Sequence, residues 1–398
     1  MIYRGLESLP YSGESTIHAV MAWGPLIDVV ERAMISFSAG EVSQPVRQMV
    51  PVPGHDAIIA AMPAVGEAMA VKVVTLYHDN AGTDLPTHQA VILIFDKENG
   101  IPLAVLDGRL ITEMRTAAGS AAAARKLAVE DPKVVTIMGS GVQARAHAEA
   151  LSKVRQFDEL RLWGRNAERA QAAATEIGAT YVANAEHAVR DADIVACTTS
   201  ATKPILEGSW LKPGAFVTSV GWNTPEGREL DDSAMANTVI VESIDAANDQ
   251  AGDVRGSGCT IFAEVGEIFA DGDRTGSRAT GSMGSGERLV DVVVHHVAAE
   301  VTGIAPTGHV ERAFGPRRVE GVVPDREHAL VAGAGAEGAR QLNDEGIALR
   351  VEKRLVAQQH GFVLCKYGGG VEDAAQDRCV KGRGDAAISR RVKRVGGG

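Results

Sequence analysis

A strand, a glycine turn and a helix follow one another without interruption between Val134 and Lys153. The run reads VVTIMGSGVQARAHAEALSK, in which β-prone residues precede the glycines and helix-forming residues follow them. Such a turn lets the backbone approach a pyrophosphate, and the helix N-terminus offers unpaired N–H groups to it. The run therefore predicts a parallel α/β domain of the Rossmann type that binds a dinucleotide. A glycine turn without a ligand is the alternative interpretation.

The residues of this turn have separate roles in that prediction. One glycine permits the sharp turn, a second allows close approach of the phosphates, and a small alanine lets the helix pack on the strand. The predicted cofactor contacts in the turn are Gly139, Gly141, Val142, Gln143 and Ala144.

A second apolar strand, Leu160–Trp163, ends at Gly164-Arg165-Asn166, where enzymes of this fold distinguish the two dinucleotides. Enzymes that prefer NAD usually place a carboxylate there, whereas a 2′-phosphate requires a cation. Arg165 fits a phosphate because a guanidinium donates two parallel hydrogen bonds, and Asn166 lies beside it. We therefore expect NADP(H) rather than NAD(H). A solvated arginine at a strand end is the alternative.

Composition limits the classes of protein to consider. The chain has 398 residues, 45% of them hydrophobic, and a formal charge of −11, which disfavours a nucleic-acid partner. No apolar run approaches the ~20 residues that span a bilayer, so we expect no membrane partner, and residues 1–10 lack the pattern of a signal peptide. The four cysteines lack CxxC spacing, which indicates reduced thiols and a cytoplasmic protein.

Residues 1–110 predict a separate α+β domain. Apolar residues at helical spacing indicate a helix over Trp23–Ser38, and a second helix, rich in Ala, is expected over Ile111–Ala128. Short connections between β-like runs indicate antiparallel strands. These strands are expected at Gln44–Val52, Asp56–Met62, Met69–Tyr77, Gln89–Phe95 and Pro102–Leu106.

Two cations in this domain are candidate site residues. Lys72 lies in the strand MAVKVVTLY, where its neighbours on both faces are apolar, and burial brings a lysine closer to proton exchange at neutral pH. Arg47 lies in an extended segment between Pro45 and Pro51, from which it could bind a substrate carboxylate. An edge-strand lysine and a surface or salt-bridged arginine are the alternatives.

Several motifs occur here in the order found in one family, and the chain resembles the ornithine cyclodeaminase/μ-crystallin family, most closely its μ-crystallin branch. The resemblance covers roughly residues 1–270. The motifs are QPVR at 44–47, TLYHDN at 75–80, His88-Gln89, MRTAAGSAAAA at 114–124, MGSGVQA at 138–144, GRN at 164–166, KPIL at 203–206, WLKPGA at 210–215, RELDD at 228–232, AGDV at 251–254 and IFAEVGEI at 261–268.

The resemblance implies hydride transfer at the α-carbon of an amino acid or its imine, in a homodimer whose active site lies between two domains. Arg47 is then the carboxylate clamp, and Lys72 handles the proton at the imine nitrogen. The resemblance also implies cofactor contacts. These are Arg115 and Thr116 on the linking helix, His88 and Gln89, Thr198, Thr199 and Ser200 after the fourth strand, and Val220 and Gly221 after the fifth.

One departure from the family distinguishes its branches. Ornithine cyclodeaminases place an aspartate where this chain has Asn223, and an amide cannot act as a general acid or base near neutral pH. Asn223 can still orient a substrate by hydrogen bonding. The resemblance therefore favours an NADP-dependent imine reductase or amino-acid dehydrogenase that takes a small imino or amino acid. An ornithine cyclodeaminase and a non-catalytic NADPH-dependent binder of small ligands are the alternatives.

The C-terminal part departs from the family more widely. Relatives continue with a Phe-Lys-Ser-x-Gly turn and a helix that returns to the first domain, of which only Leu289–Ala299 retains a helical pattern here. Residues 301–398 hold 16 Lys and Arg against 12 Asp and Glu, whereas residues 1–300 hold 24 against 39. An extra domain, a disordered basic tail and a chain read out of frame after about residue 275 all fit this shift.

The expected organisation has three parts. Residues 1–115 form a substrate-binding and dimerisation domain, residues 116–275 form the Rossmann domain, and residues 276–398 form an atypical C-terminal region. No metal site is predicted, since His295 and His296 would diverge on a helix.

Overall fold

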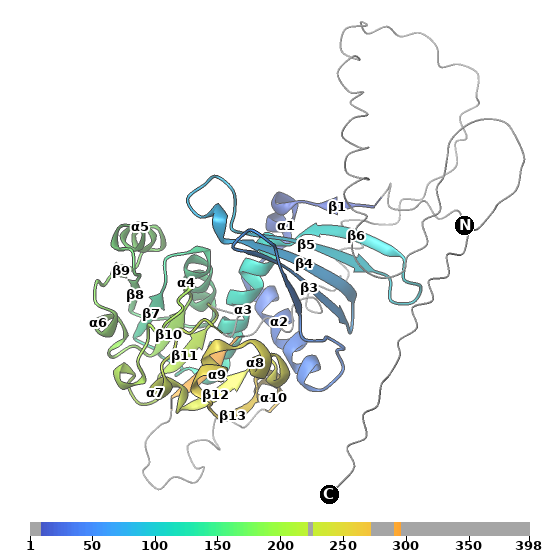
Figure 1. Cartoon of the computed structure of the whole chain (residues 1–398). Helices are drawn as coiled ribbons and strands as arrows, with labels where there is room; N and C mark the ends of the chain where they lie inside the picture. The colour runs from blue at the N-terminus through green and yellow to red at the C-terminus, as the bar shows by residue number, and fades with distance from the viewer. Residues whose placement is uncertain (1–8, 222–225, 272–289, 296–398) are drawn as a thin grey trace, which may run out of the picture. The chain divides into compact units, whose positions relative to one another are not determined.

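Residues 11–127 form a largely antiparallel sheet, in which only β1 runs parallel to its neighbour β6, with helices on one side (Figure 1). The computed structural model describes residues 9–221, 226–271 and 290–295, all of which belong to one compact unit, Met1–Arg317. Within these residues the sheet has the order β1-β6-β5-β4-β3-β2. Its strands are β1 (Tyr11–Ser12), β2 (Gln48–Pro51), β3 (Ala57–Val65), β4 (Met69–Tyr77), β5 (His88–Phe95) and β6 (Pro102–Asp107).

Most of the predicted strands of this sheet are confirmed, and so is their antiparallel pairing. The strand predicted over Gln44–Val52 is too long, because only Gln48–Pro51 is extended in the sheet. Pro45 lacks the N–H that a ladder needs and restricts the residue before it. Ahead of β2, Ser43 makes an isolated bridge to Val65.

Three helices accompany the sheet: α1 (Glu14–Val20), α2 (Trp23–Ser38) and α3 (Arg109–Leu127). Helix α2 has the predicted bounds and buries Ile27, Val30 and Met34 at helical spacing. Helix α3 is buried along its whole Ala-rich segment, because its small side chains let α2 and both sheets approach it closely. It is therefore the structural link between the two sheets (Figure 1).

The second sheet is parallel throughout its described strands and has the order β13-β12-β14-β11-β10-β7-β8-β9. Its strands are β7 (Val134–Met138), β8 (Glu159–Trp163), β9 (Thr180–Tyr181), β10 (Ile194–Cys197), β11 (Phe216–Ser219), β12 (Thr238–Val241), β13 (Ile261–Glu264) and β14 (Asp291–Val294). The chain runs to β8 on one side of β7 and to β10 on the other. The predicted Rossmann topology is thus confirmed, with its switch point at β7.

Helices connect the parallel strands. They are α4 (Val142–Val154), α5 (Ala167–Ile177), α6 (Ala185–Val189), α7 (Asp232–Met235), α8 (Ile244–Gln250), α9 (Gly252–Ser257) and α10 (Val265–Ala270). Helix α10 packs on α2 of the first half so closely that a Cβ added at Gly266 would lie 1.9 Å from the Met34 carbonyl oxygen. No helix of the described residues has the length and apolarity needed to cross a membrane.

The helix predicted over Leu289–Ala299 is wrong at its described residues. Asp291–Val294 form β14, which pairs with β11 on one side and β12 on the other. Three consecutive valines suit a strand that is buried on both faces, and the helical pattern was too short to outweigh them. Beyond the strand, His295 Nδ1 lies 2.9 Å from Glu242 Oε1, both residues being buried, and this contact joins the ends of β14 and β12.

Candidate cofactor and substrate site

The glycine turn lies between the carboxyl ends of β7 and β10. Gly139 has φ +137°, and a Cβ added there would lie 2.4 Å from Thr198 Oγ1 and 2.9 Å from the Thr198 carbonyl oxygen. Only glycine fits both the backbone conformation and this close approach. The turn is therefore at the switch point of the sheet, where ligands of this fold bind.

The N-terminus of α4 is open beside this turn. Its N-cap residue, Gly141, has no side-chain cap, and a Cβ added at Gly141 would meet no atom within 4 Å. Val142 is 54% exposed, whereas Ala144 is fully buried against the strand. Uncapped N–H groups next to open space are what a diphosphate requires, so these residues fit a dinucleotide.

Arg145 holds the turn in shape, a role that was not predicted. Its Nη1 donates to the carbonyl oxygens of Ser140 and Gly141, each at 3.1 Å, and its guanidinium pairs with Glu176. The signal in the sequence is a guanidinium four residues after the second glycine, one helical turn away. These contacts fix the carbonyls of Ser140 and Gly141.

Gln143 connects the turn to α3. Its Nε2 donates to the Glu113 carbonyl oxygen at 3.4 Å, and its own carbonyl lies 2.8 Å from His147 Nδ1. Burial lowers the pKa of His147 to about 3, so this imidazole is neutral and Nδ1 carries its proton. His147 Nε2 then accepts from the Ser120 hydroxyl at 2.9 Å. The side chain of Gln143 on α4 thus contacts the backbone of α3.

The tip of β8 presents the predicted phosphate-binding arginine. Arg165 is exposed and makes no ion pair within the described part of the chain. Asn166 Oδ1 accepts the Arg169 backbone N–H at 2.9 Å and so forms the N-cap of α5. Arg165 therefore has a guanidinium available for an anion, whereas the oxygen of Asn166 already serves the helix.

Lys72 is buried in the centre of the first sheet. It is 1% exposed, it pairs across the sheet with Met62 and Ile92, and its Nζ donates to Thr112 Oγ1 on α3 at 3.3 Å. Lys72 is therefore not the edge-strand lysine that was its alternative interpretation, and its ammonium points toward α3. The backbone carbonyl oxygen of Thr112 in turn accepts a hydrogen bond from the Thr116 hydroxyl at 2.7 Å.

Two further predicted site residues, Arg115 and Thr116, lie on α3. They are 6% and 8% exposed and lie in the second turn of the helix rather than at its start. The hydroxyl of Thr116 is used within its own helix. The side chain of Lys72 therefore contacts the same helix that carries Arg115 and Thr116, the two predicted phosphate contacts.

Arg47 reaches the second half of the chain. Its Nε donates to Gln250 Oε1 at 2.7 Å, and Gln250 Nε2 donates back to the Arg47 carbonyl oxygen at 3.1 Å. Gln250 ends α8 and is 5% exposed. This reciprocal pair holds Arg47 against the nucleotide-binding half, and nothing in the sequence identified Gln250 as its partner.

His88 and Gln89 are separated by the alternation of β5. His88 shares the inward face with the buried Ile92, whereas Gln89 is exposed and shares the outward face with Val91. The structure thus directs only His88 toward the side of the sheet that carries Lys72. Asn223 lies outside the described residues.

The loops after β10 and β11 converge on one buried carboxylate, Glu229. Glu229 accepts hydrogen bonds from Thr199 and from Gly221, and Val220 donates to the Cys197 carbonyl oxygen at 3.0 Å. Thr198 is buried beside Gly139, and Ser200 is exposed. The five residues predicted to flank the cofactor therefore lie at the carboxyl edge of the parallel sheet, as the resemblance implied.

Glu229 and its neighbour Asp253 were not predicted as site residues. Burial raises the pKa of Glu229 to about 7 and also raises the pKa of Asp253. Both residues belong to motifs recognised in the sequence, RELDD and AGDV, but no pattern in those motifs shows that the two carboxyl groups meet. Within the described residues, no three His, Cys, Asp or Glu side chains gather as metal ligands.

Comparisons with known proteins identify sequences that are similar to this chain. The profile of the Ornithine cyclodeaminase/mu-crystallin family matches residues 14–281. Ketimine reductase mu-crystallin of Mus musculus is 42% identical over 254 residues, which are 62% of this chain and 81% of the mouse protein. Delta(1)-pyrroline-2-carboxylate reductase of Bacillus cereus is 32% identical over 307 residues, 72% of this chain and 92% of that protein.

A solved structure shares the fold. It is that of Thermococcus litoralis Delta(1)-pyrroline-2-carboxylate reductase in complex with NADH and L-proline, with a TM-score of 0.67 and 29% identity. The match covers 74% of this chain and 94% of the archaeal one.

Proposed function

This chain belongs to the ornithine cyclodeaminase/mu-crystallin family, and we propose that it is an NADP-dependent reductase of α-imino acids or cyclic ketimines that also runs in reverse as an amino-acid dehydrogenase. The relatives named as ketimine and pyrroline-2-carboxylate reductases support this reaction class. The observation that carries the proposal is the burial of Lys72, whose Nζ is held toward α3 by Thr112.

The cofactor is assigned to the open glycine turn and to Arg165. Gly139, Gly141 and the first N–H groups of α4 would hold the diphosphate, and Arg165 would bind the 2′-phosphate. The archaeal relative was solved with NADH, and the exposed guanidinium of Arg165 is the reason to expect NADP(H) here instead. When bound, the nicotinamide supplies hydride to the C=N carbon.

The protein's own groups position the substrate and move the proton. Arg47, held by Gln250, binds the substrate carboxylate and so orients the imine. Lys72 donates a proton to the imine nitrogen, and Thr112 holds its ammonium in place. The imine carbon gains a hydride and the nitrogen gains a proton, which gives the amine.

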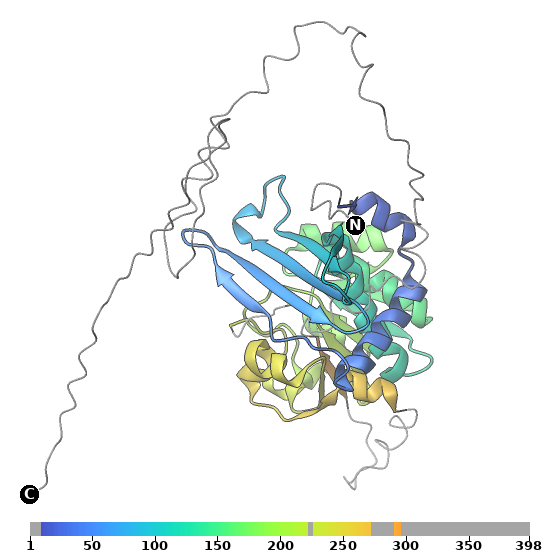
Figure 2. The same cartoon turned by 90° about the vertical axis from the view of Figure 1, so that its right-hand side faces the viewer.

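A homodimer is proposed through the open face of the first sheet. Figure 2 shows the described helices on one side of these strands, and the other side carries the exposed Ile59, Val65, Val91 and Leu103. Val73 pairs across the strands with Val91, so these side chains form one continuous apolar surface. An apolar sheet face of this kind is typical of an interface between subunits.

The test is an absorbance assay with the full chain. NADPH is mixed with cyclic ketimines or with pyruvate plus ammonia, and ornithine is mixed with NAD. Consumption of NADPH only when an imine is present supports the proposal. Release of ammonia and formation of proline from ornithine with NAD, without net formation of NADH, would instead identify a cyclodeaminase, and binding of NADPH without consumption would identify a binding protein. We keep a cytoplasmic location as a proposal, supported by the two described cysteines being free thiols.

A further inference from the structure

We propose that Glu229, Ser219 and Asp253 share one buried proton and act together as a positioning unit that sets the two loops beside the nicotinamide end of the cofactor. The consequence for the cofactor rests on the proposed function, whereas the shared proton rests on geometry alone.

Glu229 ties the two loops to one carboxylate. The residue is fully buried, and its Oε1 accepts from the backbone N–H of Thr199 at 2.5 Å and from its hydroxyl at 2.6 Å. Its Oε2 accepts from the Gly221 N–H at 2.9 Å and lies 2.9 Å from Ser219 Oγ. Thr199 follows β10 and Gly221 follows β11, so one side chain sets the separation of both strand ends.

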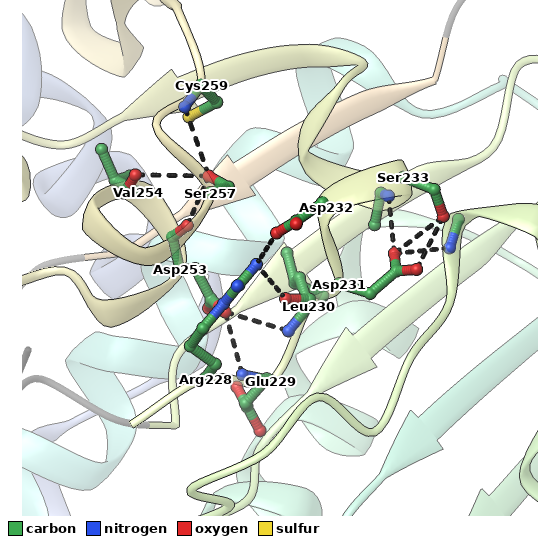
Figure 3. Close-up of polar contacts among 12 residues, drawn as sticks. Arg228, Glu229, Leu230, Asp231, Asp232, Ser233, Asp253, Val254, Ser257 and Cys259 are labelled. Atoms are coloured by element: carbon green, nitrogen blue, oxygen red, sulfur yellow. Dashed lines mark hydrogen bonds and ion pairs between the residues drawn. The ribbon is translucent and has the colours of Figure 1, made fainter. Parts of the chain in front are cut away.

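Asp253 fixes Glu229 from the other side (Figure 3). Its Oδ1 accepts the backbone N–H groups of Glu229 and Leu230, each at 2.9 Å. Its Oδ2 lies 3.1 Å from Ser219 Oγ. Ser219 therefore bridges two buried carboxyl groups.

A count of protons favours one retained proton in this arrangement. The Ser219 hydroxyl has one hydrogen, yet it lies within hydrogen-bond distance of a carboxyl oxygen on each side. One of those two contacts needs a proton from a carboxyl group. Because like charges in a buried site raise each other's pKa, the pair retains one proton to higher pH than an exposed carboxyl would.

Among the residues that the structure describes, no cation pairs with Glu229. Arg228 precedes it but donates to the Leu230 carbonyl oxygen and to Asp232, and its charge acts on Asp253 (Figure 3). Within the described residues, the thiols of Cys197 and Cys259 also lie near these carboxyl groups, and burial raises the pKa of each. Loss of the shared proton would therefore leave two negative charges joined by one hydroxyl.

Gly221 and Thr199 pack closely against each other and against Glu229. A Cβ added at Gly221 would lie 1.8 Å from the Thr199 carbonyl oxygen and 2.5 Å from Glu229 Cδ. The two loops touch directly over the carboxylate, so repulsion between Glu229 and Asp253 would be passed to both of them. We expect NADPH affinity to be highest at low pH and to weaken as pH rises through about 7, the value to which burial raises the pKa of Glu229.

Two near-isosteric substitutions distinguish the effect of the shared proton from the effect of side-chain packing. In Asp253→Asn, the amide keeps the Oδ1 acceptor and offers its NH₂ permanently to Ser219, so the variant should bind NADPH as the wild type does at low pH. Its affinity should weaken less than that of the wild type as pH rises, because the charge of Asp253 is gone while burial still acts on Glu229. In Glu229→Gln, the NH₂ group faces either Gly221 N–H or the Thr199 donors, and NADPH affinity should fall about tenfold or more. Glu226→Gln, on the exposed Glu226 of the same segment, is the control.

The measurement is the Kd for NADPH by fluorescence titration of the full chain from pH 6 to pH 9, with KM and kcat for an imine alongside. A wild-type Kd that does not change with pH, an equal pH dependence in Asp253→Asn, or normal binding by Glu229→Gln would overturn the proposal.

Thermal unfolding of the same proteins tests the shared proton without any cofactor. If the wild type binds no NADPH, that result overturns the proposed function, and the shared proton is still tested by Tm. A carboxyl whose pKa is raised in the folded state contributes stability that is complete below its unfolded value of 4.5 and is lost as pH rises through about 7. The wild type should therefore lose Tm over that range. An equal loss in Asp253→Asn would contradict the shared proton.

Discussion

The burial of Lys72 is the single-residue feature that most favours catalysis over simple binding. A lysine ammonium in the centre of an apolar sheet face is costly to maintain, and packing alone gives no reason for it. Its contact with Thr112 positions the ammonium toward α3. A proton donor beside the substrate is the use that fits this arrangement.

Lys72→Ala should therefore abolish turnover while NADPH binding survives. Loss of a general acid costs about 100-fold or more in kcat, whereas the glycine turn assigned to the cofactor belongs to the other sheet. Steady-state kinetics and NADPH titration check both parts. Lys97→Ala, on a lysine that donates to the Gly66 carbonyl oxygen at an exposed site, is the control. Near-normal turnover in Lys72→Ala would remove the assignment.

Arg165 makes a separate prediction about the choice of cofactor. Arg165→Asp replaces an exposed guanidinium by a carboxylate, so NADPH affinity should fall about 10- to 100-fold while NADH affinity is kept or improved. Titration with both dinucleotides gives the ratio, and Arg32→Asp on α2 controls for net charge. An unchanged ratio would show that Arg165 does not contact a phosphate.

At the scale of elements, the strand–turn–helix unit was predictable and the last strand was not. The unit from β7 to α4 is formed by consecutive residues, and the conformational preference of each residue matches the strand, turn or helix in which it lies. Strand β14 is short and pairs with β11, which lies far from it along the chain, so its valines could be assigned correctly only from the sheet that encloses them. The same reason explains the error over Gln44–Val52, where Pro45 outweighed the β-prone residues around it.

The two glycines of the turn should respond differently to alanine. Gly139→Ala meets Thr198 and an unfavourable φ, so both Tm and NADPH binding should fall, with a loss of stability of about 1–3 kcal/mol. Gly141→Ala meets no atom of the protein, so its Tm should remain near the wild-type value while the methyl group obstructs the phosphates. Thermal unfolding and NADPH titration of both variants check this. Normal NADPH binding by Gly141→Ala would place the diphosphate elsewhere.

At the scale of the whole molecule, the open face of the first sheet predicts the assembly. Ile59→Lys combined with Val91→Lys places two charges on the apolar surface, which should convert a dimer to a monomer because a buried ammonium is costly. Size-exclusion chromatography with light scattering measures the mass, and Val20→Lys, on a residue of α1 that is 70% exposed, is the control. A dimer that persists in the double variant would assign the interface to another surface.

The amino-acid sequence alone determined the local units of this protein: the glycine turn and its helix, α2, the antiparallel strands, and the candidacy of Lys72, Arg47 and Arg165. These depend on neighbouring residues, so periodicity and turn chemistry are sufficient to identify them. Tertiary structure alone decided which distant side chains meet, namely Arg47 with Gln250, Lys72 with Thr112, and Glu229 with Asp253. Residues far apart in the chain leave no pattern of spacing, and only the packing of β10, β11 and α9 brings two carboxyl groups to one serine.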